Sequence, residues 1–102
     1  MEKVKPVEVR IFGALRKHMD RQNLPYMLEK EMPEGKLTPV AIAGELDIPI
    51  DEIEAVFING KVSDRESILS PGDRIGFFPY GTPGPYRVFL GMVEKKNQLK
   101  NA

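Results

Sequence analysis

The second half of the chain carries two tight-turn signals that divide it into short strands. Asn59 and Gly60 form the stronger signal, because both residues tolerate the positive φ that a two-residue hairpin needs. The sequence Ser-Pro-Gly-Asp at residues 70–73 gives a second turn, in which proline presets φ and glycine accepts the positive φ that follows. The apolar runs around these turns predict strands at residues 54–58, from residue 61 onward, and at residues 74–79.

The first half of the chain predicts two more strands and one main helix. Apolar and polar residues alternate over residues 7–12, which is typical of a half-buried strand, and residues 26–32 favour a second strand. Thr38 is a suitable helix cap, Pro39 suits the first helical position, and Pro49 is expected to end the helix. The order β-β-α-β-β-β indicates an α+β fold, with a mixed sheet and one main helix packed on one face.

Charge and composition exclude several classes of function. The chain has 102 residues, which predicts one domain, and its 15 basic and 15 acidic side chains cancel, so no nucleic-acid partner is expected. It contains no cysteine, which excludes disulfides, a thiolate metal site and a cysteine nucleophile. The longest apolar run is far too short to span a bilayer, and no signal peptide is visible, so we expect a cytoplasmic protein with no membrane partner.

The single histidine does not indicate catalysis. His18 lies among charged residues in a segment, residues 14–19, that favours a short helical turn, and we expect it at the surface. No second histidine or cysteine is present to complete a metal site, and no serine forms a plausible triad with His18. We therefore expect a protein that is not an enzyme and that holds neither a metal nor a cofactor.

The composition changes near Tyr80, where prolines and glycines become frequent. Such a segment forms no regular helix, and its prolines cannot donate hydrogen bonds to the interior of a sheet. We expect one folded domain over residues 1–84 and an extension over residues 85–102. Within that extension, residues 87–90 are a candidate edge strand, and a polar tail follows.

Three segments resemble the motifs of one family of small proteins. Residues 9–16 (Val-Arg-Ile-Phe-Gly-Ala-Leu-Arg) resemble V-x-x-F-A-x-L-R, and residues 56–61 (Val-Phe-Ile-Asn-Gly-Lys) resemble V-x-V/I-N-G. Residues 69–79 (Leu-Ser-Pro-Gly-Asp-Arg-Ile-Gly-Phe-Phe-Pro) resemble L-x-D/P-G-D-x-V-x-F-F-P. These are motifs of the MoaD/ThiS family of sulfur carriers. The resemblance therefore implies that residues 1–84 form the ubiquitin-like β-grasp fold of that family.

The resemblance also implies a function that depends on the C-terminus. In this family a flexible tail ends in Gly-Gly, and an adenylating, E1-like enzyme activates the terminal carboxylate with ATP. Sulfur then replaces one carboxylate oxygen, and the resulting thiocarboxylate serves a larger synthase-type subunit. In this chain Gly84 falls near the expected end, but Pro83 precedes it and the chain continues, and Gly91 is the other candidate end.

Two functions remain open at this point. The first is a sulfur-carrier-like protein that resembles the small subunit of molybdopterin synthase and acts in molybdenum or tungsten cofactor biosynthesis, either after C-terminal trimming or through an atypical end. The alternative is a β-grasp protein-interaction module that has lost thiocarboxylate chemistry.

Three phenylalanines are the candidate docking residues. Strand alternation predicts that Phe12, Phe57 and Phe78 point away from the apolar face that packs on the helix. An exposed cluster of these rings would be a surface for a partner protein, and carriers of the family dock with the corresponding sheet face. The alternative is that part of the extension, residues 88–90, folds over the rings as additional core.

Overall fold

The computed structural model describes residues 4–81. The candidate ends Gly84 and Gly91 and the candidate edge strand at residues 87–90 lie outside the described residues, as does the extension itself. The described residues include the sheet, the helices and the three phenylalanines Phe12, Phe57 and Phe78.

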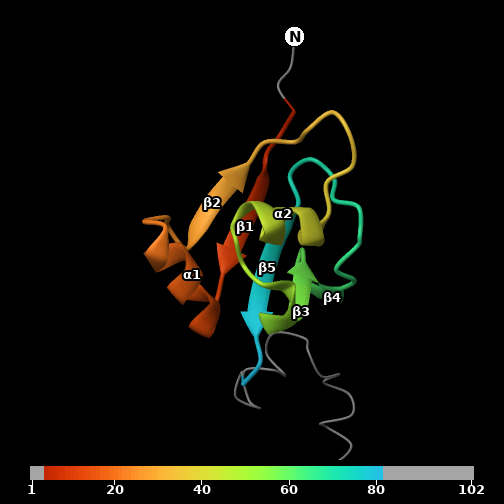
Figure 1. Cartoon of the computed structure of the whole chain (residues 1–102). Coiled ribbons are helices and arrows are strands. Elements are labelled where there is room, and N and C mark those ends of the chain that lie inside the picture. The colour runs from red at the N-terminus through yellow and green to blue at the C-terminus, as the bar shows by residue number, and fades with distance from the viewer. Residues whose placement is uncertain (1–3, 82–102) are drawn as a thin grey trace, which may run out of the picture.

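The described residues form a mixed five-stranded sheet (Figure 1). Its spatial order is β2-β1-β5-β3-β4, with β1 and β5 parallel and the other neighbours antiparallel. The strands are β1 (Val7–Ile11), β2 (Met27–Lys30), β3 (Ile53–Ile58), β4 (Lys61–Ser63) and β5 (Arg74–Pro79). This arrangement confirms the predicted α+β, β-grasp fold.

Strand β2 is shorter than predicted, because its partner β1 begins at Val7 and offers no further residue for β2 to pair with. Lys30, its last residue, pairs with Val7, the first residue of β1. Pro6 precedes Val7 and has no N–H group to donate, so pairing does not continue toward residue 32.

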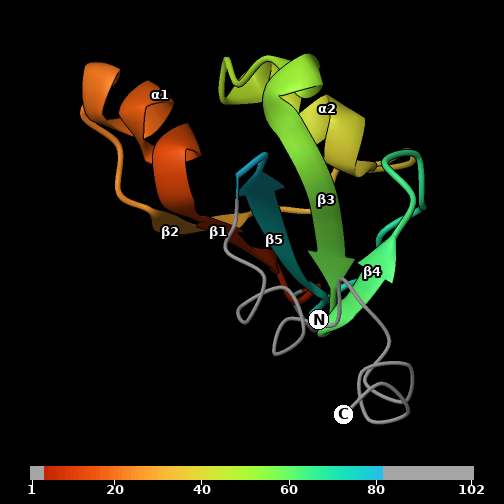
Figure 2. The same cartoon turned by 90° about the horizontal axis from the view of Figure 1, so that it is seen from below.

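The helices lie on one side of the sheet (Figure 2). They are α1 (Arg16–Arg21), which follows the 3-10 turn η1 (Gly13–Leu15), and α2 (Pro39–Glu45), which precedes the 3-10 turn η2 (Ile50–Glu52). Thr38 caps α2 as predicted, since its side-chain oxygen accepts a 3.2 Å hydrogen bond from the Ala41 N–H.

Helix α2 already ends at Glu45, so Pro49 is not the residue that ends it, contrary to the sequence prediction. Asp47 takes a left-handed conformation with φ of 58°, and the Ile48 N–H donates to the Ala43 carbonyl at 2.9 Å. The Asp47 N–H donates to the Gly44 carbonyl at 3.2 Å. These two bonds form a Schellman motif, which ends the helix by satisfying its last carbonyls.

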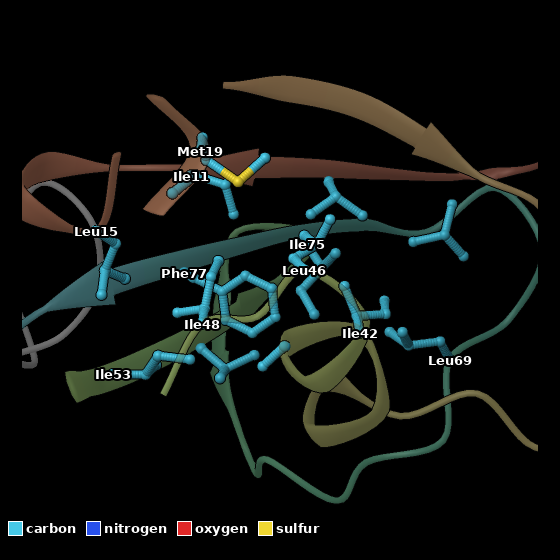
Figure 3. Close-up of a cluster of buried hydrophobic side chains, with 14 of the residues drawn as sticks. Ile11, Leu15, Met19, Ile42, Leu46, Ile48, Ile53, Leu69, Ile75 and Phe77 are labelled. Atoms are coloured by element: carbon cyan, nitrogen blue, oxygen red, sulfur yellow. The ribbon is translucent and has the colours of Figure 1, made fainter. Parts of the chain in front are cut away.

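The main core lies between the helices and one face of the sheet (Figure 3). The side chain of Phe77 is fully buried there, in one cluster with aliphatic residues of β1, α2, β3 and β5. The core members are Val7, Val9, Ile11, Leu15, Met19, Leu37, Ile42, Ala43, Leu46, Ile48, Ile53, Val56, Leu69, Ile75 and Phe77.

The two predicted turns are bound to each other. Asn59 and Gly60 have φ of 53° and 83°, as the hairpin requires. The Asn59 side-chain amide donates to Asp73 Oδ1 at 2.9 Å, and the Arg74 N–H donates to Asn59 Oδ1 at 3.0 Å. Asp73 Oδ2 accepts a further bond of 2.8 Å from the Ser70 N–H. We call this set of hydrogen bonds the turn clasp.

We predict that Asn59 and Asp73 are energetically coupled. In Asn59→Gly the positive φ stays accessible while the side chain is lost, and Asp73→Ala removes both carboxylate bonds. Each single variant should unfold at lower urea concentration. A double-mutant cycle should give a coupling of about 0.5–1.5 kcal/mol, the net value of a typical hydrogen bond. Strictly additive changes in the free energy of unfolding would contradict the clasp.

Candidate partner-docking face

The three predicted phenylalanines lie together. Phe12 follows β1, Phe57 lies in β3 and Phe78 lies in β5. The rings of Phe12 and Phe78 are stacked, with centroids 4.3 Å apart and planes at 5°. Phe57 meets Phe78 edge to face, with centroids 4.8 Å apart. Such pairs contribute about 0.5–1.5 kcal/mol each beyond their buried area, so the cluster is ordered.

The ring cluster occupies the sheet face opposite the helices. Ile11, Val56 and Phe77, the residues just before each phenylalanine, belong to the main core, and none of the three phenylalanines does. Side chains alternate along a strand, so the rings point to the other face. The strand-alternation argument therefore places them correctly.

Two of the rings are more buried than predicted. Phe57 and Phe78 expose only 6% and 5% of their surface, and Phe12 is half-buried. The expectation of three exposed rings is therefore wrong for Phe57 and Phe78. One physical reason is that the rings lie against one another and close to the sheet rather than extending into solvent.

Gly76 allows this close approach, and the sequence analysis missed it. A Cβ atom at Gly76 would lie 3.1 Å from Phe12 Cε2 and 3.3 Å from Phe78 Cε1. Gly76 pairs with Phe57 on one side and with Arg10 on the other. A glycine in the middle of a strand marks a site of close approach, which is the signal that could have identified it.

A shallow groove runs beside the rings. Its volume is about 260 Å³, and its lining includes the three phenylalanines and Gly76. Charged side chains of β1 and β5 also line it, and Glu8 accepts a 2.8 Å hydrogen bond from Arg10. The groove therefore combines an apolar floor with a charged margin, as protein-binding surfaces do.

The apolar surface continues to the edge strand β4. Val62 pairs with Phe57, so both side chains are on the same face, and Val62 is 50% exposed. We define the docking face as Phe12, Phe57, Val62, Gly76 and Phe78. It crosses four of the five strands of the sheet.

His18 is not a surface residue, contrary to the sequence prediction. It lies in α1 and exposes only 4% of its surface. Its Nε2 lies 2.8 Å from Glu52 Oε1, and Arg21 Nη2 donates to its Nδ1 at 3.1 Å. A guanidinium can only donate, so Nδ1 is the accepting nitrogen in this geometry and Nε2 is the nitrogen that faces the Glu52 carboxylate. The sequence indicated the helical turn, but it could not show that the His18 side chain points toward η2.

This histidine network joins α1 to η2. The hydrogen bond from His18 and the nearby Lys17 ammonium hold the pKa of the Glu52 carboxyl below its ordinary value, although partial desolvation opposes them. In residues 4–81 no cluster of three or more histidine, aspartate or glutamate side chains could hold a metal ion. No helix among these residues is long and apolar enough to cross a membrane.

The strand order, the helix layer and the paired turns define a ubiquitin-like β-grasp protein. The model of the Mut7-C ubiquitin family matches residues 4–83, and the chain belongs to this family. The sequence-based assignment to the ubiquitin-like β-grasp class is thereby confirmed.

One similar solved structure is SAMP1 from Haloferax volcanii. The two chains align with a TM-score of 0.55 and 19% sequence identity, over 78% of this chain and 99% of SAMP1. At this level of identity the likeness concerns the fold alone. No curated protein matches this sequence.

We predict that Gly76→Ala destabilises the protein. The added methyl group would meet two rings that are stacked on each other, and overpacking of this kind costs about 1–3 kcal/mol. The matched control is Gly44→Ala in α2, where no atom lies within 4 Å of the added Cβ. That change should stabilise the protein by about 1 kcal/mol. Urea unfolding measures both, and equal shifts of the midpoint would contradict the prediction.

We also predict that Glu52 makes stability depend on pH in the acid range. Because its folded-state pKa is lowered, the unfolded chain binds the proton more readily. The contribution is therefore complete above the ordinary glutamate pKa of about 4.3 and is lost as pH falls through the lowered value.

Glu52→Gln tests this dependence by removing the charge and retaining the side-chain shape. The wild-type chain should unfold at a higher urea concentration than the variant at pH 7, and the difference should shrink at pH 3. A difference that is the same at both pH values would show that Glu52 ionisation does not stabilise the fold.

Proposed function

We propose that this protein is a non-enzymatic ubiquitin-like module that binds a partner protein through the docking face. The observation that carries the proposal is the stacked ring cluster on the sheet face opposite the helices. These rings do not contribute to the main core, which is complete on the other face.

The docking face has the physical properties of a preorganised interface. Its rings are already held against one another and over Gly76, so a partner would immobilise few additional side chains on binding. The half-buried Phe12 and the exposed Val62 leave apolar surface for a partner to cover. The charged margin beside the groove would form the polar rim.

A non-enzymatic role agrees with the chemistry of the side chains. The single histidine is occupied between Glu52 and Arg21, and the sequence contains no cysteine.

The test is site-specific photo-crosslinking in the native host. A benzophenone amino acid at Val62 should give a discrete protein adduct. The matched control is the same group at Ile68, which is similarly exposed, at 59%, but lies outside the docking face. Phe12→Asp in the Val62-labelled chain should reduce the adduct severalfold. Equal adducts from both positions, or none from Val62, would overturn the proposal.

A sulfur-carrier function is the second candidate. Its support is that the three segments resembling carrier motifs fall on the end of β1 with η1, on the β3–β4 hairpin, and on β5 with its preceding turn. This candidate role, in molybdenum or tungsten cofactor synthesis, requires an E1-like adenylating enzyme and a larger synthase-type subunit. It also requires hydrolysis of the peptide bond after Gly84 or after Gly91, which would supply the carboxylate.

Intact mass spectrometry separates this candidate from the first. The full chain is co-expressed with the adenylating enzyme of the same host and a sulfur donor. A product that ends at Gly84 or Gly91, with one oxygen replaced by sulfur, is the expected carrier species. A full-length chain of unchanged mass, with no trapped adenylate, would exclude the carrier role and leave the binding role standing.

A further inference from the structure

We propose that the chain's own segment 86–90 (Tyr-Arg-Val-Phe-Leu) occupies the docking face in the free protein and competes with the partner. The inference rests on the proposed function, because it assumes that this face is the partner site. Its support comes from where β5 ends, which face remains uncovered, and the composition of the chain that follows.

The extension begins at the centre of the sheet. Strand β5 is flanked by β1 on one side and β3 on the other, so a continuing chain cannot add a strand beside it. Gly81 has φ of 89°, a conformation that turns the chain soon after Pro79. Because both edges of β5 are already paired, an apolar segment that follows such a turn can pack on the sheet only by lying across one of its faces.

The two sheet faces of residues 4–81 differ in what covers them. Helices α1 and α2 and the main core occupy one face (Figure 2). The other carries the ring cluster and the groove of about 260 Å³, which extends from Phe12 and Phe78 toward Arg74 and Gly60. The groove therefore begins at the rings near the end of β5 and runs back along that strand.

The length of the intervening chain allows the segment to reach the groove. Residues 82–85 separate Gly81 from the segment, and an extended chain covers about 3.3 Å per residue. Phe89 can therefore lie as far as about 26 Å from Gly81, which exceeds the length of a strand of six residues, about 20 Å. The segment can reach every part of the docking face.

The sequence of the extension concentrates its apolar residues where they can reach the groove. Val88, Phe89 and Leu90 are consecutive, and a mostly polar tail begins at Glu94. Pro83 and Pro85 fix φ in the connection, which lowers the conformational entropy lost on docking. Burying three apolar side chains gains free energy of the same order as the cost of ordering five residues, so a partner can displace the segment.

The test uses paramagnetic broadening in the full-length chain, whose lack of cysteine permits a single nitroxide label. The label is attached through Arg87→Cys, which leaves the apolar side chains in place. Amide signals of Arg10, Val62 and Gly76 should broaden strongly, and those of Ile42 and Ala43 in α2, behind the sheet, should broaden much less. The same label attached through Gln98→Cys is the position control and should broaden the docking face less.

A second substitution in the labelled chain tests the cause of the broadening. Phe89→Ser should reduce the broadening of the three docking-face signals severalfold, and the matched Leu99→Ser should leave it unchanged. Broadening that is equal on both faces, or absent, would overturn the inference. So would broadening that arises only in mixtures of labelled and isotope-enriched chains, because the occupant would then be a second copy.

Failure of this inference is distinguishable from failure of the proposed function. If Val62 captures a partner but the Arg87 label broadens no docking-face signal, the face binds a partner without competition from the segment. If the label broadens the face and Val62 captures nothing, the segment is a permanent part of the domain. In that case the proposed function fails, and with it the competition between segment and partner.

Discussion

The parallel pairing of β1 with β5 connects the two ends of the described chain. The register runs from Glu8–Arg74 to Ile11–Phe77, and the Phe12 N–H donates to the Phe77 carbonyl at 3.1 Å. Parallel strands cannot be joined by a tight turn, so all the elements from η1 to β4 lie in the long connection that leads from β1 to β5. The pairing makes β5 a central strand with apolar groups on both faces, where Phe77 meets the helices and Phe78 meets the other rings. Loss of this pairing would therefore disturb the core around Phe77 and the docking face around Phe78 at the same time.

Local signals in the sequence were sufficient for most of the fold. The alternation in β1 and the Thr38 cap of α2 both predict what the structure contains, because the deciding interactions lie within a few residues. Strand β5 is harder, since Ile75 to Pro79 are all buried and a continuous apolar run does not say which side chain faces which layer. The assignment of Phe77 to the core face and Phe78 to the opposite face depended on strand alternation alone. The regular pairing of β5 with β1 explains why that alternation is kept.

The candidate site was less predictable because contacts between distant residues decide it. The burial of His18 depends on Glu52, which follows it by many residues. The ring burial depends on Gly76, whose missing side chain gives space to Phe12 from another strand. The end of α2 at Asp47 is a different case, because propensity alone does not select aspartate for a left-handed position. Sequence patterns assign a side chain to a face, but neighbours across the sheet determine how much of it remains exposed.

The turn clasp changes what the motif resemblance means. The Asn-Gly and Pro-Gly-Asp signatures resemble those of sulfur carriers. In this structure, however, the side chains of Asn59 and Asp73 hydrogen-bond to each other and to nearby backbone groups. Two motifs that look independent in sequence are therefore one structural unit, which fixes how the β3–β4 hairpin meets the start of β5. These side chains therefore have a structural role that does not depend on whether the chain carries sulfur. In this protein the motif residues stabilise the fold, so evidence for sulfur chemistry has to be sought in the residues that follow the sheet.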